Sequence, residues 1–319
     1  MTSIDTLATD YRAITEACGL LDRSERGKLA LTGADAKEFL QGQVSNDVEG
    51  LTPGAGCYAA FLTPKGKMLG DVRILRSDDE LLLDTERVAL QPLFNMIRRF
   101  SLGYQVELHK RTLERGMLSL LGPAAAELAG AGALPSNEHA HGLFEVPGAG
   151  VLARAIRTDL GVDLLCDAAD TSALGAALED AGAVAVSEQA AECLRIERGR
   201  PRYGIDLDET VIPQEAGLNE RAVSFTKGCY VGQETVARLF YRGKPNRQLR
   251  GLRLSGPTQT GEELAYEGRT VGRVTSVATS PRLGPIGLGF VRREAPVGTV
   301  VSVGEDSGVT AEVIELPFR

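Results

Sequence analysis

The sequence lacks the features that mark several classes of protein. It has no tryptophan. Its five cysteines are scattered without a CxxC pair, so neither a disulfide framework nor a zinc site can be identified. No apolar run approaches the ~20 residues that span a bilayer. The amino terminus has neither the basic region nor the apolar stretch of a signal peptide. These absences predict a cytoplasmic protein in a reducing compartment, with no membrane anchor.

An excess of positive charge is also missing. The formal net charge is −8, which argues against the broad basic surface that nucleic acid or an anionic membrane would favour. Small ligands and protein partners therefore remain as candidates. The length of 319 residues exceeds what one compact core usually holds, and it predicts two or three structural units.

Regular elements can be placed along the first half of the chain. Residues 28–47 are typical of a strand, a Gly-Ala-Asp turn and a helix, and residues 118–132 repeat that order, which hints at a duplicated half. Two apolar runs within residues 71–85, split by polar residues, predict a hairpin. Residues 90–100 predict a helix. Its apolar face consists of Leu93, Met96, Ile97 and Phe100.

The middle of the chain is rich in glycine, proline and alanine. Residues 130–150 therefore predict a loop, which carries His139 and His141. These two histidines can be considered as metal ligands, but no third ligand is placed nearby, and a site needs three or four. We expect no metal site there.

Short alternating segments with glycine turns fill the last quarter of the chain. They predict a small β barrel or sandwich over residues 246–319. The preceding residues 1–245 predict an α+β region of two related lobes, with a boundary near residues 112–150 and an interleaved order as one option.

The stretch "KGCYVGQE", Lys227 to Glu234, places a cysteine between two glycines beside a lysine. The residues that follow have helical spacing, so Cys229 is expected just before a helix. A helix dipole and the Lys227 cation would lower the pKa of the thiol below its usual value of ~8.5. The alternative is a small buried cysteine in a tight glycine loop.

The same stretch resembles the hallmark of the YgfZ family of folate-binding proteins, relatives of the glycine-cleavage T-protein. The segments "FLQGQVSNDV", "YAAFLTPKGKMLGDVRI", "IPQEAGL" and "VGRVTSVATSPRLGPIGLGFVRRE" resemble that family in the same order. The resemblance implies a three-lobed fold with a central cleft for tetrahydrofolate or another reduced folate. It also implies a role in assembling or repairing iron–sulfur clusters on client enzymes, together with those clients or assembly proteins as partners.

The resemblance also assigns residues of the folate site. Asp71 matches the second of two T-protein aspartates near the reacting folate nitrogens, while Gly70 replaces the first. The alternative for Asp71 is an acid at a strand end, paired with Arg73 or Lys67. Asp163 falls where T-proteins carry a pterin-binding glutamate.

Further candidates for the site follow later in the chain. Ala191 replaces a T-protein arginine that grips folate, whereas Arg195 of the adjoining motif is kept. Arg195 and the arginines after it are expected to seat the glutamate tail of folate or an acidic partner, or to form a solvated basic stretch. Tyr230 and Gln233, with Lys227, are expected to hold a ligand beside Cys229 or to support the loop.

Three functions follow as hypotheses. The first is a tetrahydrofolate-binding accessory protein for iron–sulfur clusters that uses Cys229, and it is favoured because T-proteins lack this cysteine. The second is an aminomethyltransferase with Asp71 as a catalytic residue. The third is a folate-binding regulator without chemistry of its own. A resident cluster is not expected, because five scattered cysteines show no ligand spacing.

Overall fold

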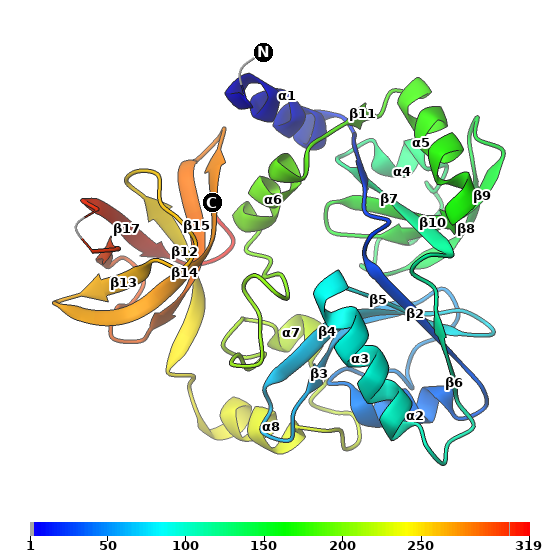
Figure 1. The fold of residues 1–319 in the computed structure, drawn as a ribbon, viewed down its shortest axis with the longest axis horizontal. Helices are drawn as coiled ribbons and strands as arrows, with labels where there is room; N and C mark the ends of the chain where they lie inside the picture. Colours follow the sequence, from blue (N-terminus) through cyan, green and yellow to red (C-terminus); the bar gives the residue numbers. More distant parts are fainter. Residues whose placement is uncertain (1–2, 306) are drawn as a thin grey trace.

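The computed structural model describes residues 3–305 and 307–319, which form three lobes (Figure 1). Two lobes are built on separate β sheets, and the third is a closed barrel. This arrangement confirms the predicted α+β fold with a small β barrel at its carboxyl end. Among the described helices, none combines the length and the hydropathy needed to cross a bilayer.

The first lobe is a five-stranded antiparallel sheet in the order β3-β4-β5-β2-β6. The predicted hairpin forms its β4 and β5. Apolar residues of two helices cover one face of the sheet. The strands are β2 (Gly27–Thr32), β3 (Gly56–Leu62), β4 (Met68–Arg76), β5 (Leu81–Thr85) and β6 (Glu107–Lys110), and the helices are α2 (Ala36–Gln43) and α3 (Arg87–Phe100).

The second lobe is a six-stranded sheet in the order β11-β1-β7-β10-β9-β8. Its β1 precedes the first lobe in the sequence and its β7 follows that lobe, so the first lobe is inserted between two paired strands of the second. Its strands are β1 (Gly19–Asp22), β7 (Arg115–Leu121), β8 (His141–Val146), β9 (Val151–Arg157), β10 (Gly161–Asp167) and β11 (Val184–Ala185). Its helices are α4 (Ala125–Leu128), the 3-10 turn η1 (Ala168–Asp170) and α5 (Thr171–Asp180).

The third lobe is the barrel, in the order β12-β15-β14-β13-β16-β17. Its strands are β12 (Arg247–Leu254), β13 (Glu263–Tyr266), β14 (Arg269–Ser280), β15 (Gly284–Arg292), β16 (Val300–Val303) and β17 (Val309–Ile314). Four helices lie outside the three sheets, and α6 packs between β14 and α1. They are α1 (Ser3–Glu16), α6 (Glu188–Glu197), α7 (Asn219–Ala222) and α8 (Gln233–Arg242).

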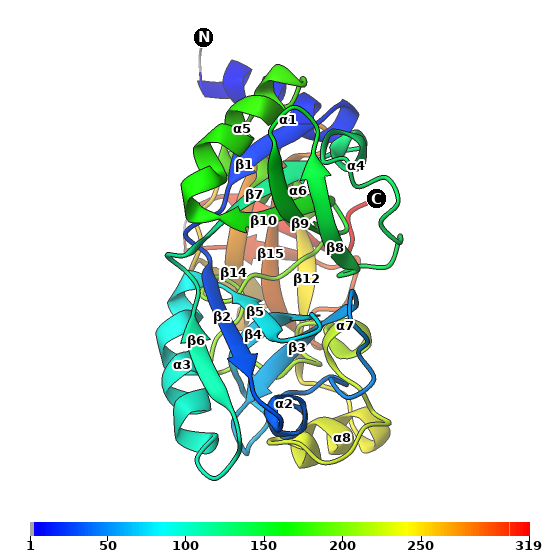
Figure 2. The same cartoon turned by 90° about the vertical axis from the view of Figure 1, so that its right-hand side faces the viewer.

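The two sheets also pack against each other, one above the other in Figure 2. A small apolar cluster joins them, with members from both lobes. Its members are Ala30, Leu75, Leu82, Met117, Ile156 and Leu165. Strands β4 and β5 are therefore covered on both faces, which explains why they are almost wholly buried.

Two details of the sequence interpretation are wrong. Residues 130–150 are not all loop, because His141–Val146 form β8, which pairs with β9 and completes the edge of the second sheet. Phe100 does not share the buried face of its helix. It is the last residue of α3 and is half exposed, whereas Leu93 and Ile97 are buried.

Candidate functional site

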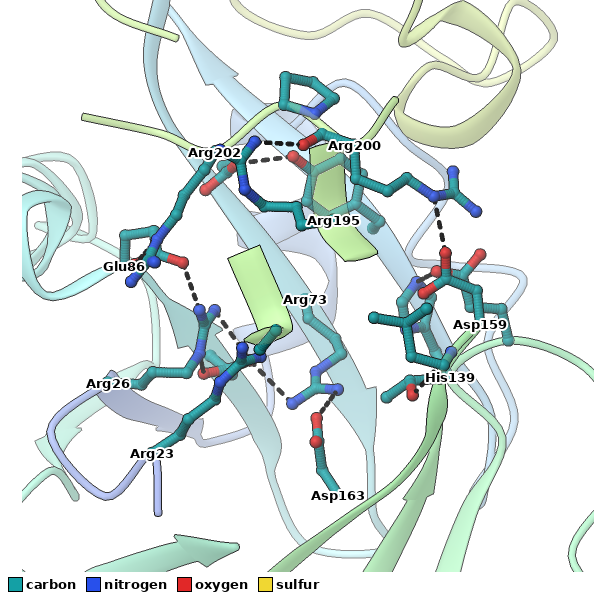
Figure 3. Close-up of a pocket in the computed structure, with 18 of the residues that line it drawn as sticks. Arg23, Arg26, Arg73, Glu86, His139, Asp159, Asp163, Arg195, Arg200 and Arg202 are labelled. Carbon is teal, nitrogen blue, oxygen red and sulfur yellow. Dashed lines mark hydrogen bonds and ion pairs between the residues drawn. The ribbon is translucent and has the colours of Figure 1, made fainter. Parts of the chain in front are cut away.

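A cavity of about 210 Å³ lies where the two sheets meet the segment around α6 (Figure 3). Strands β4 and β5 supply one wall, β10 supplies another, and α6 with the loop after it closes a third. Asp71, Asp163 and Arg195, which are far apart in the sequence, all line this cavity. Ala191 lines it too, at the position where an arginine was expected from the T-protein pattern.

The walls of the cavity are strongly charged. Seven arginines and eight acids line it, and each of the seven arginines pairs with at least one carboxylate. The arginines are Arg23, Arg26, Arg73, Arg195, Arg200, Arg202 and Arg221. Paired charges hold one another in fixed orientations, so the polar atoms of the walls are already positioned for a ligand.

Asp71 lies within β4 and is buried, with 7% of its surface exposed. The hydroxyl of Tyr58 donates a hydrogen bond of 2.6 Å to its Oδ2. Burial raises the pKa of the Asp71 carboxyl to about 6, and the hydrogen bond from Tyr58 offsets part of that rise. The carboxyl is therefore poised to hold or release a proton close to neutral pH.

The alternative interpretation of Asp71 paired it with Arg73 or Lys67. Arg73 instead pairs with Asp84 at 2.9 Å and Asp163 at 2.6 Å, and Lys67 lies 3.9 Å from Glu215. In the described part of the chain, no cation lies within ion-pair distance of the Asp71 carboxyl. That pairing is therefore wrong.

Asp71→Asn should change how stability depends on pH. The folded protein holds the Asp71 proton up to about pH 6, whereas the unfolded chain releases it near the ordinary value of about 3.9. Ionisation of Asp71 therefore lowers stability as the pH rises between these values. We expect the free energy of unfolding of Asp71→Asn, relative to the wild type, to increase by about 2 kcal/mol from pH 4 to pH 7. Urea unfolding of both proteins at pH 4 and at pH 7 measures this difference in stability. A difference that is the same at the two pH values would contradict the prediction.

Asp163 lies in β10 and faces the same cavity. Arg73 Nη1 donates a hydrogen bond of 2.6 Å to Asp163 Oδ2, and Ser119 Oγ donates one of 2.6 Å to Oδ1. Each carboxylate oxygen can accept two hydrogen bonds, so both retain acceptor capacity for a ligand.

Arg195 lies in α6 and is held from several sides. Its Nη1 donates to Asp206 Oδ2 at 2.7 Å, its Nη2 donates to Ser276 Oγ at 2.8 Å, and its Nε donates to Glu192. The guanidinium thus joins α6 to the barrel strand β14. Its contacts with the protein use all three nitrogens, so its role at the cavity includes fastening the third lobe.

The "KGCYVGQE" stretch lies outside this cavity. Among the described lining residues there is no member of it. The ammonium of Lys227 donates hydrogen bonds to the carbonyl oxygens of Gln41, Val44 and Asn46, at 2.6, 2.7 and 2.9 Å. Lys227 therefore caps the carboxyl end of α2, where helix carbonyls lack partners.

Three other residues of this stretch, Tyr230, Gly232 and Gln233, also have structural positions in the loop. Tyr230 is buried, with Lys227 Nζ 5.0 Å from the centre of its ring. Gln233 is the first residue of α8. Gly232 has φ +84°, and a Cβ there would lie 2.5 Å from the carbonyl oxygen of Thr63. Contacts of this kind fit the supporting role of Lys227, Tyr230 and Gln233, and their expected ligand contacts remain a prediction.

Lys227→Met should destabilise the protein. Methionine keeps a similar length but leaves three carbonyl oxygens without the ammonium that they bind. We expect the free energy of unfolding to fall by about 2 kcal/mol, as measured by urea unfolding. Lys65→Met, at an exposed position in the adjoining turn, is the control and should cost less than about 0.5 kcal/mol. Equal effects of the two substitutions would contradict the capping role.

Cys229 is exposed, unlike the other cysteines. Cys18, Cys166 and Cys193 are buried, and Cys57 is half-buried. Burial raises the pKa of the Cys18 thiol to about 11 and those of Cys57 and Cys193 to about 12, and it also raises that of Cys166. A thiolate forms least readily at those four positions.

A maleimide reagent at pH 7 should therefore label Cys229 first. We expect Cys229 to be modified at least about tenfold faster than any other cysteine, because the others are shielded and held as thiols. Peptide mass spectrometry of the native protein over time gives the five rates. If a second cysteine reacts as fast as Cys229, the expected selectivity is wrong.

Several residues of the cavity were not predicted from the sequence. Arg73 and Asp84 are charged residues within almost wholly buried strands. In the sequence, a charged residue inside an apolar run was the signal that could have identified them as site residues. His139 was treated as part of a loop, but it is buried and lines the cavity. Among the described residues, no group of three or more potential ligands is arranged to hold a metal ion.

Known proteins share this architecture. Residues 2–227 match the GCVT N-terminal domain, and residues 247–319 match the glycine cleavage T-protein C-terminal barrel domain. A putative chloroplastic transferase of Arabidopsis thaliana is 30% identical over 92% of this chain and 70% of its own length. An aminomethyltransferase of Rubrobacter xylanophilus is 31% identical over 98% of this chain and 86% of its own length.

A solved structure is similar over nearly the whole chain. The glycine cleavage system aminomethyltransferase T of Bartonella henselae superimposes with a TM-score of 0.86 and 25% identity, over 98% of this chain and 89% of the other. The fold of the three lobes, of which the barrel is the third, is therefore similar to that of this T-protein. From its two matching domains, the chain belongs to the family of proteins that combine a GCVT N-terminal domain with a glycine cleavage T-protein C-terminal barrel domain.

Proposed function

We propose that the central cavity binds tetrahydrofolate or another reduced folate. The observation that carries this proposal is the meeting of Asp71 and Asp163 in one charged cavity of a GCVT fold. Asp163 has free acceptor capacity for the amine and ring N–H groups of a pterin. Asp71, whose pKa burial raises to about 6, can exchange a proton close to neutral pH and can orient or protonate the ligand next to it.

Unpartnered atoms in the walls support the fit of a polar ligand. Three buried nitrogens of lining residues lack a hydrogen-bond partner: Arg73 Nε, His139 Nδ1 and Arg221 Nε. Buried polar groups are normally satisfied, so these atoms mark a stretch of wall whose hydrogen bonding the protein's own groups do not complete. When bound, a reduced folate would supply a nitrogen of its reduced ring and a neighbouring nitrogen outside that ring, which together carry a one-carbon unit.

We further propose that the protein is a folate-binding accessory factor of the YgfZ type for iron–sulfur clusters. Cys229 supports this role because it is an exposed thiol presented on a braced loop outside the cavity. A single exposed thiol can act as one ligand while a partner supplies the remaining ligands of a cluster. In this role the cluster is a substrate that the protein passes to the client enzyme, and it is not a resident group of this protein.

Aminomethyl transfer is the second candidate. The similarity to two aminomethyltransferases and the raised pKa of Asp71 favour it. The replacement of an aspartate by Gly70 opposes it. A Cβ at Gly70 would lie 3.0 Å from Leu93 Cδ1 of α3, so the side chain of an aspartate there would enter the apolar core.

Two measurements separate these proposals. Calorimetry with tetrahydrofolate tests the site, and the absence of both binding heat and thermal stabilisation would overturn it. An assay with an aminomethyl-loaded carrier protein then tests catalysis. An accessory factor should release ammonia and methylenetetrahydrofolate far more slowly than a true T-protein does, and an equal rate would favour the aminomethyltransferase.

A further inference from the structure

The outer face of α8 carries exposed aromatic rings next to positive charge. Val236 is buried in the core on the inner side of the helix, whereas Arg238 and Arg242 are exposed. Tyr241 is 68% exposed, and Phe240 is 45% exposed. Residues three and four apart are neighbours on a helix surface, so Tyr241 and Arg242 both lie beside Arg238. This face therefore exposes a ring beside a pair of cations in one compact area.

The cations of this face have no carboxylate partner. Among the ion pairs of the described residues, none includes Arg238, Arg242 or Lys244, the exposed lysine that follows the helix. Arginines four residues apart on a helix repel each other, and the helix dipole favours only the one in the last turn, Arg242. Residues 224–247 contain five cations and one acid, although the net charge of the chain is −8. The positive charge of this face is therefore local and uncompensated.

The same rings adjoin the loop that carries Cys229. The Phe225 ring stacks on that of Phe240 with the ring centroids 3.8 Å apart, and Tyr241 meets Phe225 at an edge, at 6.4 Å. Residues 226–232 connect this stack to the first turn of α8, and Cys229 is exposed in the middle of them. Figure 1 shows α8 at the edge of the molecule, just before the chain enters the barrel. A protein that binds the outer face of α8 therefore comes close to the thiol.

The chemistry of this face indicates an acidic protein surface as its partner. Aromatic rings and arginines are enriched where proteins meet, and a guanidinium can bind both oxygens of a carboxylate. A single-stranded nucleic acid would stack its bases on open ring faces, but Phe225 and Phe240 each cover one face of the other. The overall charge of −8 also opposes a polyanion. The proposed client enzyme must reach Cys229 to share a cluster, so it is the protein expected at this surface.

We infer that the outer face of α8 docks an acidic segment of the client enzyme that receives the cluster. The docking surface, called the α8 patch, consists of Phe225, Arg238, Phe240, Tyr241, Arg242 and Lys244. This inference rests on the proposed accessory function. Carboxylates of the client pair with Arg238 and Arg242, and an apolar side chain of the client packs against Tyr241. The client surface that supplies the remaining cluster ligands is thereby brought to Cys229.

Substitutions in a deletion strain test the α8 patch. Arg238→Gln combined with Arg242→Gln removes both charges and keeps good helix formers. We expect this double variant to restore at least about fivefold less activity of four-iron enzymes than the wild type, at an equal protein level. Arg98→Gln combined with Arg99→Gln is the matched control, because these exposed arginines end α3 beside the exposed ring of Phe100. The control should restore activity as the wild type does.

A binding measurement uses a client directly. The probe is the four-iron enzyme whose activity falls most in the deletion strain, purified without its cluster. Surface plasmon resonance should show that Tyr241→Ser weakens binding by about tenfold or more, whereas Phe100→Ser leaves it unchanged. Wild-type binding should also weaken as salt is added. Absence of wild-type binding, or equal binding by Tyr241→Ser, would overturn the inference.

Other occupants of the α8 patch are tested with the same two variants. The probes are a single-stranded uridine oligonucleotide, phosphatidylserine vesicles and, by sedimentation, a second copy of the protein. If one of these binds the wild type more tightly than the client does, and Tyr241→Ser abolishes that binding, the inference is wrong about the partner.

The docking surface and the accessory function can fail separately. If Cys229→Ala fails to restore four-iron enzymes while the Arg238→Gln and Arg242→Gln double variant restores them fully, the α8 patch is wrong and the accessory function stands. If Cys229→Ala restores them fully, the accessory function falls, and the docking surface falls with it.

Discussion

Asp206→Ala should lower the free energy of unfolding by about 3–5 kcal/mol. The Asp206 carboxylate is buried with 3% of its surface exposed, and it accepts four hydrogen bonds. One comes from Arg195 of α6, one from the backbone N–H of Arg202, and two from Thr275 and Ser276 of β14. Alanine would leave the Arg195 guanidinium short of its buried anion and would loosen the contact between α6 and the barrel.

The size of this effect can be measured by urea unfolding followed by circular dichroism. Asp208→Ala is the matched control, because Asp208 is an exposed acid on the same loop and binds only Thr210. Its loss should cost less than about 1 kcal/mol. Comparable costs for the two variants would show that the Asp206 network does not fasten the barrel.

Cys229→Ala should abolish the support of iron–sulfur enzymes without affecting folding. Cys229 is exposed, so its removal leaves no cavity, and the free energy of unfolding should change by less than about 0.5 kcal/mol. The thiol itself is the proposed contact with the client enzyme. In a deletion strain, the variant should fail to restore the activity of four-iron enzymes, although it accumulates to the wild-type level.

The reciprocal control is Cys18→Ala. Cys18 is 1% exposed and belongs to the apolar core of the second lobe, so alanine there should lower stability by about 1 kcal/mol but retain activity in the deletion strain. Full rescue by Cys229→Ala would mean that the thiol is dispensable. The motif would then serve only to brace the loop through Lys227 and Gly232.

The main helices and strands were predictable because their patterns are local. The apolar runs of residues 71–85 split by polar residues became the β4–β5 hairpin, and the spacing in residues 90–100 became α3. The strand β8 was missed because glycine and proline dominate its surroundings, and its pairing with β9 is the feature that defines it. Such pairing depends on a distant neighbour rather than on local composition.

The candidate site shows the same division. The resemblance to known motifs singled out Asp71, Asp163 and Arg195, and the structure brings these three to one cavity. It also grouped Lys227 with ligand-binding residues, whereas the ammonium is occupied by the end of α2. A lysine beside a cysteine suggests an activated thiol, but the sequence does not reveal which carbonyl groups fold against that lysine.

The sequence by itself determined the mixed α+β class, the barrel at the carboxyl end and the family resemblance, because periodicity and motif order are properties of neighbouring residues. Only the tertiary structure decided the pairing of seven arginines with acids from distant segments, the burial that raises the pKa of Asp71, and the place of His139 on the cavity wall. These depend on distances between residues that the chain separates by tens of positions, and on the exclusion of water from the space between them.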